Sequence, residues 1–301
     1  MNNEKKGYLS TILMSLIMGM QYIFIKDLIK LSNNNVFFVL SVRFFIALLI
    51  MMIIFKIKKE KIDLSLKNKD MFKLSFYNPV INFSFQTIGV MLCPVTTVSV
   101  LIALIPIANV VVSYFTLKER LSLKQSLFMG ICIIGTLIAS VSSSAHNDYH
   151  FALIGAILII LSIFSRAIYQ AKLKQQSKIN QSIDKVCFYQ IYYGFTIFLI
   201  IFLIFTFLSP TTDFISILLT KDFIIGILYL SVLATIGVFY LNNYAVKNIS
   251  VISIGLMNNI TVLVSTLAGV FFLSEKFTLV EAVGIFMILL GSYFYYKDKK
   301  Q

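Results

Sequence analysis

The fold is decided by two stretches of sequence, SYFTLKERLSLKQ (Ser113–Gln125) and AGVFFLSEKFTLVE (Ala268–Glu281). Each one leaves an apolar run, passes through a short charged turn and leads toward the next apolar run. A shift of 156 residues brings them into register and pairs Glu119 with Glu275. The same shift pairs Ser122 with Thr278 and Gly135 with Gly291. Ordered self-similarity at a fixed shift indicates an internal repeat.

The sequence around the repeat is mostly apolar. Of the 301 residues, 58% are hydrophobic and only 13% are charged, and the mean hydropathy is +0.89. Soluble domains are about 45–50% apolar and about 25% charged. The excess is too large for one or two anchoring helices, so an ordinary soluble protein is excluded and most of the chain is expected to lie in lipid.

The apolar residues form ten runs, each bounded by polar or charged residues. The runs are Tyr8–Lys30, Val36–Phe55, Phe72–Leu92, Thr96–Leu117, Gln125–Val141, Phe151–Ala171, Val186–Leu208, Phe223–Val246, Val251–Leu273 and Leu279–Tyr296. A helix needs about 20 apolar residues to cross a bilayer, which these lengths match. A membrane barrel would instead alternate apolar and polar residues. The prediction is an all-α polytopic membrane protein with ten transmembrane helices.

Lysine and arginine alternate between the loops that join these runs. Of the 26 basic residues, 20 lie at the termini and in the even-numbered loops, and 3 lie in the odd-numbered loops. Positive charge is retained on the cytoplasmic side of a membrane. Both termini are therefore predicted in the cytoplasm. The net charge of +13 is then explained by the basic residues of the cytoplasmic loops, and no nucleic-acid partner is needed to account for it.

The number of runs sets the relation between the two copies of the repeat. Five helices per copy is an odd number, so residues 147–301 must enter the membrane the other way up from residues 1–146. Two inverted five-helix repeats are typical of secondary transporters, in which the halves open a central site to each side in turn.

A longer stretch resembles a known family: QTIGVMLCPVTTVSVLIALIPIANVVVSYFTLKERLSLKQSLFMGICIIGTLIA (Gln86–Ala139). It contains Pro106 in the middle of the predicted fourth helix, the turn Glu119-Arg120, and glycines in the fifth helix. This pattern is similar to the EamA family of the drug/metabolite transporter superfamily, and the similarity extends over nearly the whole chain. The resemblance implies two five-helix bundles, transport of small organic metabolites, and export in preference to uptake.

Three basic residues fall inside the predicted helices: Lys26, Arg43 and Arg166. A charge at the centre of a helix costs about 2.5–3.5 kcal/mol on insertion scales, so each needs an explanation. Lys26 and Arg43 lie near the predicted outer end, where a long side chain can extend to the interface. Arg166 lies near the inner end and can anchor that interface. The alternative for all three is a place in the transport cavity, where Arg43 and Lys26 would attract an anionic group.

Uncharged polar residues within the runs are the other candidates. In the first half, Gln21, Tyr22, Asn82 and Gln86 could form a polar wall, since Asn82 and Gln86 share a helix face at a four-residue spacing. In the second half, Asn243, Asn258 and Asn259 could do the same. Any single amide can instead be packing between helices. Three further candidates complete the predicted cavity: Pro106, as a kink or a static bend, Asn109 and Tyr169.

Catalysis and bound cofactors are not expected. No GxxxxGK[ST] loop is present for an ATP-driven pump. His146 and His150 flank Asp148 without a third ligand, so no metal site is predicted. The interpretation is a secondary carrier of a small organic solute, such as an amino acid, in a bacterial cytoplasmic membrane. A channel or facilitator and a membrane-embedded enzyme are the alternatives. The partners are the solute and the lipid bilayer; a monomer is compatible with the sequence, which leaves the oligomeric state open.

Overall fold

The computed structural model is helical in all of its regular structure, and its described residues contain no strand. These residues are 2–59, 69–93, 98, 101–102, 104–120, 122–141, 149–176, 182–208, 214–273 and 279–299. The helices are α1 (Asn3–Leu31), α2 (Val36–Lys58), α3 (Lys69–Ser75), η1 (Phe76–Ile81), α4 (Asn82–Leu92), α6 (Ile105–Leu117), α7 (Leu123–Val141), α8 (Tyr149–Gln176), α9 (Ile183–Leu208), α10 (Phe214–Leu218), α11 (Lys221–Leu228), η2 (Tyr229–Gly237), α12 (Val238–Asn248), α13 (Val251–Met257), α14 (Ile260–Leu273) and α15 (Leu279–Lys299). The all-α prediction is confirmed for this part of the chain.

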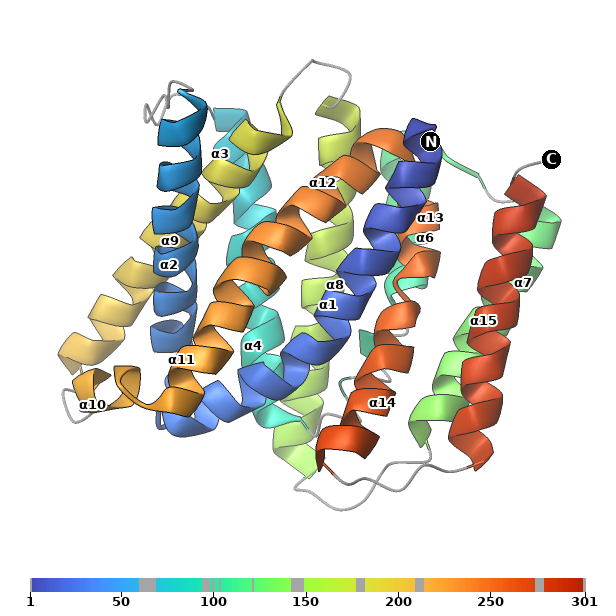
Figure 1. Cartoon of the computed structure of the whole chain (residues 1–301). Coiled ribbons are helices and arrows are strands. Elements are labelled where there is room, and N and C mark those ends of the chain that lie inside the picture. The colour runs from blue at the N-terminus through green and yellow to red at the C-terminus, as the bar shows by residue number, and fades with distance from the viewer. Residues whose placement is uncertain are drawn as a thin grey trace.

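Among the residues that the structure describes, five helical segments are long and apolar enough to cross a membrane on their own. They are Asn3–Leu31, Val36–Lys58, Leu153–Gln176, Ile183–Phe207 and Lys221–Asn248. The shorter apolar helices are Ile105–Leu117, Leu123–Gly135, Val251–Ser265 and Ala282–Tyr295. All belong to one bundle (Figure 1). Ten crossings stay a prediction, of which these five are the clearest.

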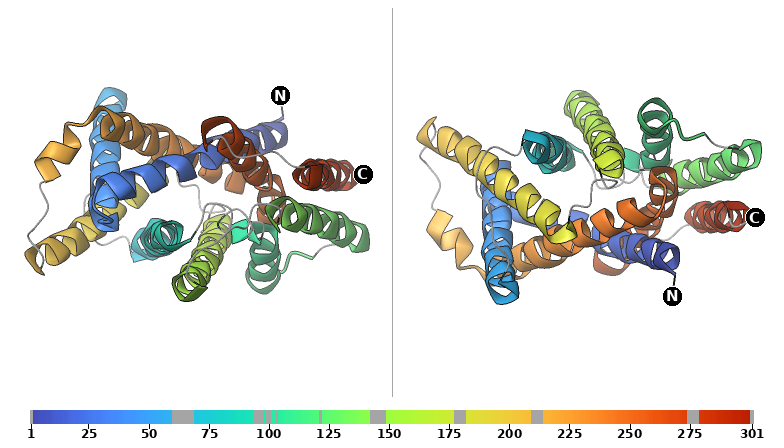
Figure 2. Two further views of the ribbon diagram at one scale, coloured as in Figure 1. Left: turned by 90° about the horizontal axis from the view of Figure 1, so that it is seen from below. Right: turned by 90° about the horizontal axis from the view of Figure 1, so that it is seen from above.

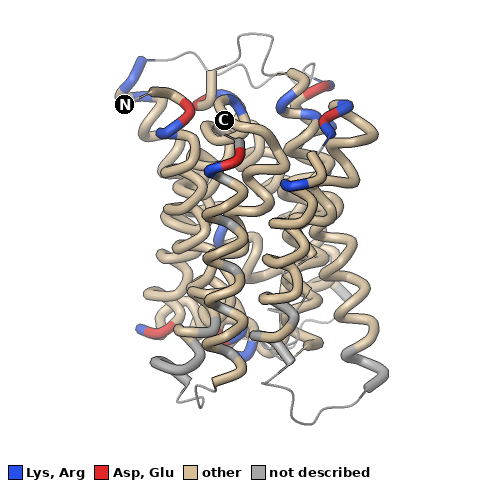
Figure 3. Tube along the Cα trace, turned by 90° about the vertical axis from the view of Figure 1, so that its right-hand side faces the viewer, with Lys and Arg blue, Asp and Glu red and all other residues tan. Residues whose placement is uncertain are grey.

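The outside of the bundle suits lipid. Large apolar side chains are more than half exposed along its sides, among them Ile53 at 58%, Leu153 at 62% and Leu203 at 55%. Soluble proteins rarely expose apolar surface on this scale. Charged residues gather instead at the two ends of the bundle (Figure 3). The beginning of α1 and the end of α15 lie at the same end (Figure 1).

The helices pack in two groups that resemble each other. The long helix α1 packs against α12 and α14, and the long helix α8 packs against α4 and α6. The helices α2 and α9 pack against each other, as do α7 and α15, which form one edge of the bundle (Figure 2). The first helix of each predicted repeat, α1 or α8, therefore packs against the third and fourth helical segments of the other repeat.

Two helices change their winding at corresponding places. The segment η1 joins α3 to α4 across a kink, and the π-helical segment η2 joins α11 to α12. Within η1, the backbone of Asn78 is not helical, with φ −145° and ψ 111°. Within η2, the Thr235 hydroxyl donates to the carbonyl of Leu230, five residues earlier, at 2.8 Å. π-helical segments such as η2 are rare and concentrate at functional sites.

Two further helices begin inside the bundle. The helix α6 starts at Ile105, and α14 starts at Ile260, with two residues between it and the end of α13. Pro106 therefore lies in the first turn of α6, where its missing N–H leaves no hydrogen bond unmade. This differs from the prediction of a proline in the middle of a continuous helix, so the described helix needs no kink at Pro106.

Glycines allow the closest approaches between the helices. A methyl group at Gly89 on α4 would lie 2.5 Å from Cγ1 of Ile159 and 3.0 Å from the carbonyl oxygen of Gly155, both on α8. A methyl group at Gly19 on α1 would lie 2.5 Å from Cβ of Val264 on α14. Small residues at helix interfaces are how membrane helices gain packing contacts.

Candidate functional site

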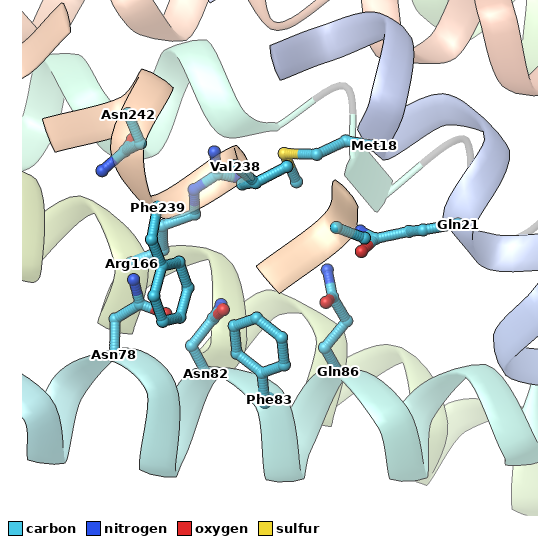
Figure 4. Close-up of a pocket in the computed structure, with 11 residues that line it drawn as sticks. Met18, Gln21, Asn78, Asn82, Phe83, Gln86, Arg166, Val238, Phe239 and Asn242 are labelled. Carbon is cyan, nitrogen blue, oxygen red and sulfur yellow. The ribbon is translucent and has the colours of Figure 1, made fainter. Parts of the chain in front are cut away.

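A small polar cavity lies where α1, η1, α4, α8, η2 and α12 meet (Figure 4). Its lining residues are Met18, Gln21, Asn78, Asn82, Phe83, Gln86, Arg166, Ala234, Val238, Phe239 and Asn242. The cavity volume is about 20 Å³. This is room for about one water molecule. Five of the lining residues are amides and one is a cation, so the cavity is far more polar than the surrounding core.

The amides of the third predicted segment reach the cavity from one side. Asn78, Asn82 and Gln86 follow each other at four-residue spacing across η1 and α4, and Figure 4 shows them in one row. Asn82 donates through Nδ2 to the carbonyl of Ser162 on α8 at 2.9 Å. Gln86 donates through Nε2 to the hydroxyl of Tyr22 on α1 at 3.3 Å. These bonds fix the row between α1 and α8.

Arg166 brings a positive charge into the cavity from α8. Its side chain is 8% exposed, and its Nη2 lies 3.6 Å from the sulfur of Met14. No acidic residue lines the cavity, and Lys58–Asp184 is the ion pair found in the described part of the chain. A guanidinium has five N–H donors and pairs well with carboxylates. Within the described residues, the site therefore presents a buried cation that no acidic side chain pairs with.

A hydrogen-bond network extends from the cavity between α8, α9 and α12. Tyr169 donates through its hydroxyl to Oδ1 of Asn243 at 2.6 Å, and Asn243 donates through Nδ2 to Oε1 of Gln190 at 2.9 Å. Gln190 in turn donates through Nε2 to the carbonyl of Asn78 in η1 at 3.1 Å. Two of the predicted cavity residues, Tyr169 and Asn243, thus lie outside the lining and are connected through Gln190 to the backbone of the lining residue Asn78.

A parallel branch includes Asn109, another predicted cavity residue. Gln170 donates to Oδ1 of Asn242 at 2.6 Å, and Asn109 donates to Oε1 of Gln170 at 3.1 Å. Asn109 also donates to the carbonyl of Val251 at 3.0 Å. This branch connects α6 and α13 to the cavity residue Asn242.

Arg43 lies beside the cavity and outside its lining. It is 1% exposed and donates through Nε to the hydroxyl of Thr235 at 2.6 Å and through Nη2 to the carbonyl of Ala234 at 2.8 Å. Its guanidinium carbon also lies 4.6 Å from the centre of the Phe83 ring. Arg43 therefore joins α2 to η2 and backs the aromatic wall of the cavity. Lys26 is exposed on α1 and does not line the cavity.

Asn258 and Asn259 occupy the junction between α13 and α14. Oδ1 of Asn258 accepts a hydrogen bond from the Ser15 hydroxyl on α1 at 3.2 Å. Neither polar atom of the Asn259 side chain has a hydrogen-bond partner in the described part of the structure, although the residue is only 1% exposed. Buried polar groups are usually bonded, so this junction holds unused hydrogen-bonding capacity.

Of the predicted cavity residues, the structure brings Gln21, Asn82, Gln86 and Arg166 into one lining, with Tyr22 bonded to it. Asn78 and Asn242 also line it and are absent from the predicted set. The four-residue spacing that links Asn82 to Gln86 extends back to Asn78 and is the signal that could have found it. The turn residue Glu275 and the loop residues His146 and Asp148 lie outside the described residues.

Comparisons with known proteins agree with this architecture. The model of the EamA-like transporter family matches the chain twice, at residues 5–141 and 153–297. A Bacillus subtilis (strain 168) protein named uncharacterized transporter YcxC is 26% identical over 299 residues, covering 96% of this chain and 92% of that protein. A solved crystal structure, described only as that of a protein, has a TM-score of 0.73 at 13% identity and covers 98% of both chains. This last likeness shows the fold alone.

Proposed function

Because the chain belongs to the EamA-like transporter family, we propose that this membrane transporter is a secondary carrier that moves a small organic solute by alternating access. The polar cavity around Arg166 is the solute site in this proposal. The observation that carries it is the convergence of one buried cation and five amides on a space bounded by helices of both packing groups. Family membership points to transport rather than to catalysis.

The lining of the cavity defines the chemistry of the solute. Arg166 is paired with no acid there, so an anionic group of the solute would provide the missing charge. Carboxylates bind arginine through two parallel hydrogen bonds, which also fixes their orientation. The amides of Gln21 and Asn82 can donate and accept bonds to the rest of the molecule. An amino acid or a related carboxylate fits this combination.

The size of the cavity supports alternating access. About 20 Å³ cannot hold an organic solute, since sites for drug-sized molecules occupy about 300–1,000 Å³. The helices around Arg166 must therefore separate before a solute binds. Two similarly packed groups of helices can exchange roles in opening the site to each side.

The location and topology of the carrier complete the proposal. Residues 1–146 and 147–301 form two inverted five-helix units with ten crossings, and both termini lie in the cytoplasm of a bacterial cell. The alternation of lysine and arginine between loops supports this orientation. Export is favoured over uptake on the family resemblance.

The test is solute counterflow in proteoliposomes that contain the purified full chain. Unlabelled solute inside the vesicles should accelerate the entry of labelled solute from a panel of amino acids and related carboxylates. A channel gives no such acceleration, and an enzyme would return a chemically altered solute. Either result would overturn the carrier proposal.

Substitution of Arg166 tests the site itself. Arg166→Gln should lower counterflow about 100-fold, because each hydrogen bond to a charged group contributes about 1.5–3 kcal/mol. Arg166→Lys should retain part of the activity, since the charge remains while the paired geometry is lost. Arg120→Gln, which removes an exposed arginine, is the matched control and should transport normally. Unchanged counterflow in Arg166→Gln would show that the solute binds elsewhere.

A further inference from the structure

A second and larger cavity lies at the end of the bundle that carries the start of α1. It is an open groove of about 730 Å³ between α1, α9 and α12. Its lining residues are Lys6, Leu9, Ser10, Leu13, Ile183, Asp184, Tyr240, Leu241, Tyr244 and Lys247. The start of α1 and the end of α12 lie next to each other at this end (Figure 1). None of these residues lines the cavity around Arg166, so the groove is a separate site.

The charge of the groove is positive at one end. Lys6 and Lys247 are both exposed, and neither forms an ion pair in the described part of the structure. The acid that lines the groove is already engaged, because Asp184 pairs with Lys58 at 2.8 Å and also accepts a hydrogen bond from the Tyr240 hydroxyl. The ammonium groups of Lys6 and Lys247 are therefore available to bind an anion.

The apolar residues of the groove lie deeper along the same helices. Leu13 follows Lys6 by seven residues on α1, and Leu241 precedes Lys247 by six residues on α12. At about 1.5 Å per residue, the apolar wall extends about 10 Å from the lysines toward the middle of the bundle. Leu9 and Leu13 are 46% and 43% exposed, so the wall is accessible from the side of the bundle.

We infer that this groove binds an anionic phospholipid. The phosphate lies between Lys6 and Lys247, and the start of an acyl chain lies along Leu9, Leu13 and Leu241. Charge and apolar surface are arranged in the order that a lipid presents them, with the head group at the interface and the chain below it. Basic pockets between membrane helices recognise anionic head groups in this way.

The experiment measures lipid affinity by native mass spectrometry on the purified full chain in detergent. Phosphatidylglycerol should bind at least tenfold more tightly than phosphatidylcholine of the same chain length. Lys6→Gln combined with Lys247→Gln should weaken phosphatidylglycerol binding about 30-fold. Each lysine near an anionic lipid contributes about 1 kcal/mol, and the loss of both corresponds to that change in affinity. The double variant Lys124→Gln and Lys297→Gln removes two exposed lysines outside the groove and should change the affinity less than threefold.

Three results would overturn the inference. One is equal affinity for the two lipids, and another is equal weakening in both double variants. The third is binding of glycerol 1-phosphate as tight as that of phosphatidylglycerol, which would mean that a free phosphate and not a lipid occupies the groove. Photoreactive phosphatidylglycerol offers a check on the unaltered chain. It should label peptides that contain residues 6–13 or 240–247, and labelling confined to other segments would contradict the site.

Discussion

Asn109 and Asn259 are both buried amides, but their surroundings differ. Asn109 donates two hydrogen bonds that connect α6 with α8 and α13. Asn259 has no hydrogen-bond partner for either polar atom of its side chain in the described part of the structure. Removing a bonded group leaves its partners unsatisfied, whereas removing an unbonded group leaves nothing behind. The two residues should therefore respond in opposite ways to the same change.

Asn109→Ala should lower the free energy of unfolding by about 1–3 kcal/mol, because Oε1 of Gln170 loses its donor. Asn259→Ala should leave the free energy of unfolding unchanged or raise it. Thermal unfolding of both variants in the same detergent measures the difference. Equal destabilisation in the two variants would mean that Asn259 has a partner in this state of the protein.

The same contrast shows what sequence can say about single residues. Depth along a helix can be counted, and the sequence places Arg43, Arg166, Asn82 and Gln86 inside predicted helices; all four are buried in the structure. The side toward which a long side chain extends depends on its neighbours from distant parts of the chain. Arg43 donates to Thr235, which is 192 residues away, and no spacing in the sequence predicts that contact.

At the scale of helices, close contact depends on positions without a side chain. Gly89 on α4 faces Ile159 and Gly155 on α8 at distances that leave no room for a methyl group. Gly130 on α7 has, among the described residues, no atom of another element within 4 Å of the place where a methyl group would lie. These two glycines provide a matched pair for testing helix packing.

Gly89→Ala should destabilise the protein by about 1–3 kcal/mol, as expected for overpacking. Gly130→Ala should be neutral or stabilising by up to about 1 kcal/mol, since alanine favours a helix over glycine. Thermal unfolding under identical conditions gives both values. A fully stable Gly89→Ala protein would show that α4 and α8 can move apart at little cost.

The interruptions of the helices were the least predictable elements. The apolar runs predict helices at 72–92 and 223–246, and the structure has helices at both. A π segment has no marked composition, so η2 in the sequence YLSVLATIG is indistinguishable from an ordinary helix. Pro106 predicts a kink or a static bend within a helix, but the structure has the beginning of α6 there.

For the whole molecule, the apolar composition and the repeat were sufficient to predict a helical membrane protein. Family membership and the helical architecture confirm that level of description. The number of crossings and the orientation in the membrane stay predictions, because they depend on where the bilayer lies. The charges at the two ends of the bundle indicate its position.

Labelling of single cysteines tests the orientation. Cysteines that replace Lys30 or Lys221 should react with a membrane-impermeant maleimide on intact cells, and cysteines that replace Lys124 or Lys297 should react only after permeabilisation. All four lysines are exposed. The native cysteines at positions 93, 132 and 187 are buried, and replacing them with alanine removes the background. Labelling of all four from one side would contradict the inverted arrangement.

The π-helical segment η2 affects the direction in which the residues that follow it point around the helix axis. A π turn accommodates one residue more than an α turn, which puts the residues on its two sides out of phase by about 100°. The amides Asn242 and Asn243 follow η2, so their direction around the axis of α12 depends on that extra residue. Deleting one residue from η2 would rotate both amides away from Tyr169 and Gln170. The orientation of Asn242 and Asn243 toward α8 and α9 thus depends on the winding of η2.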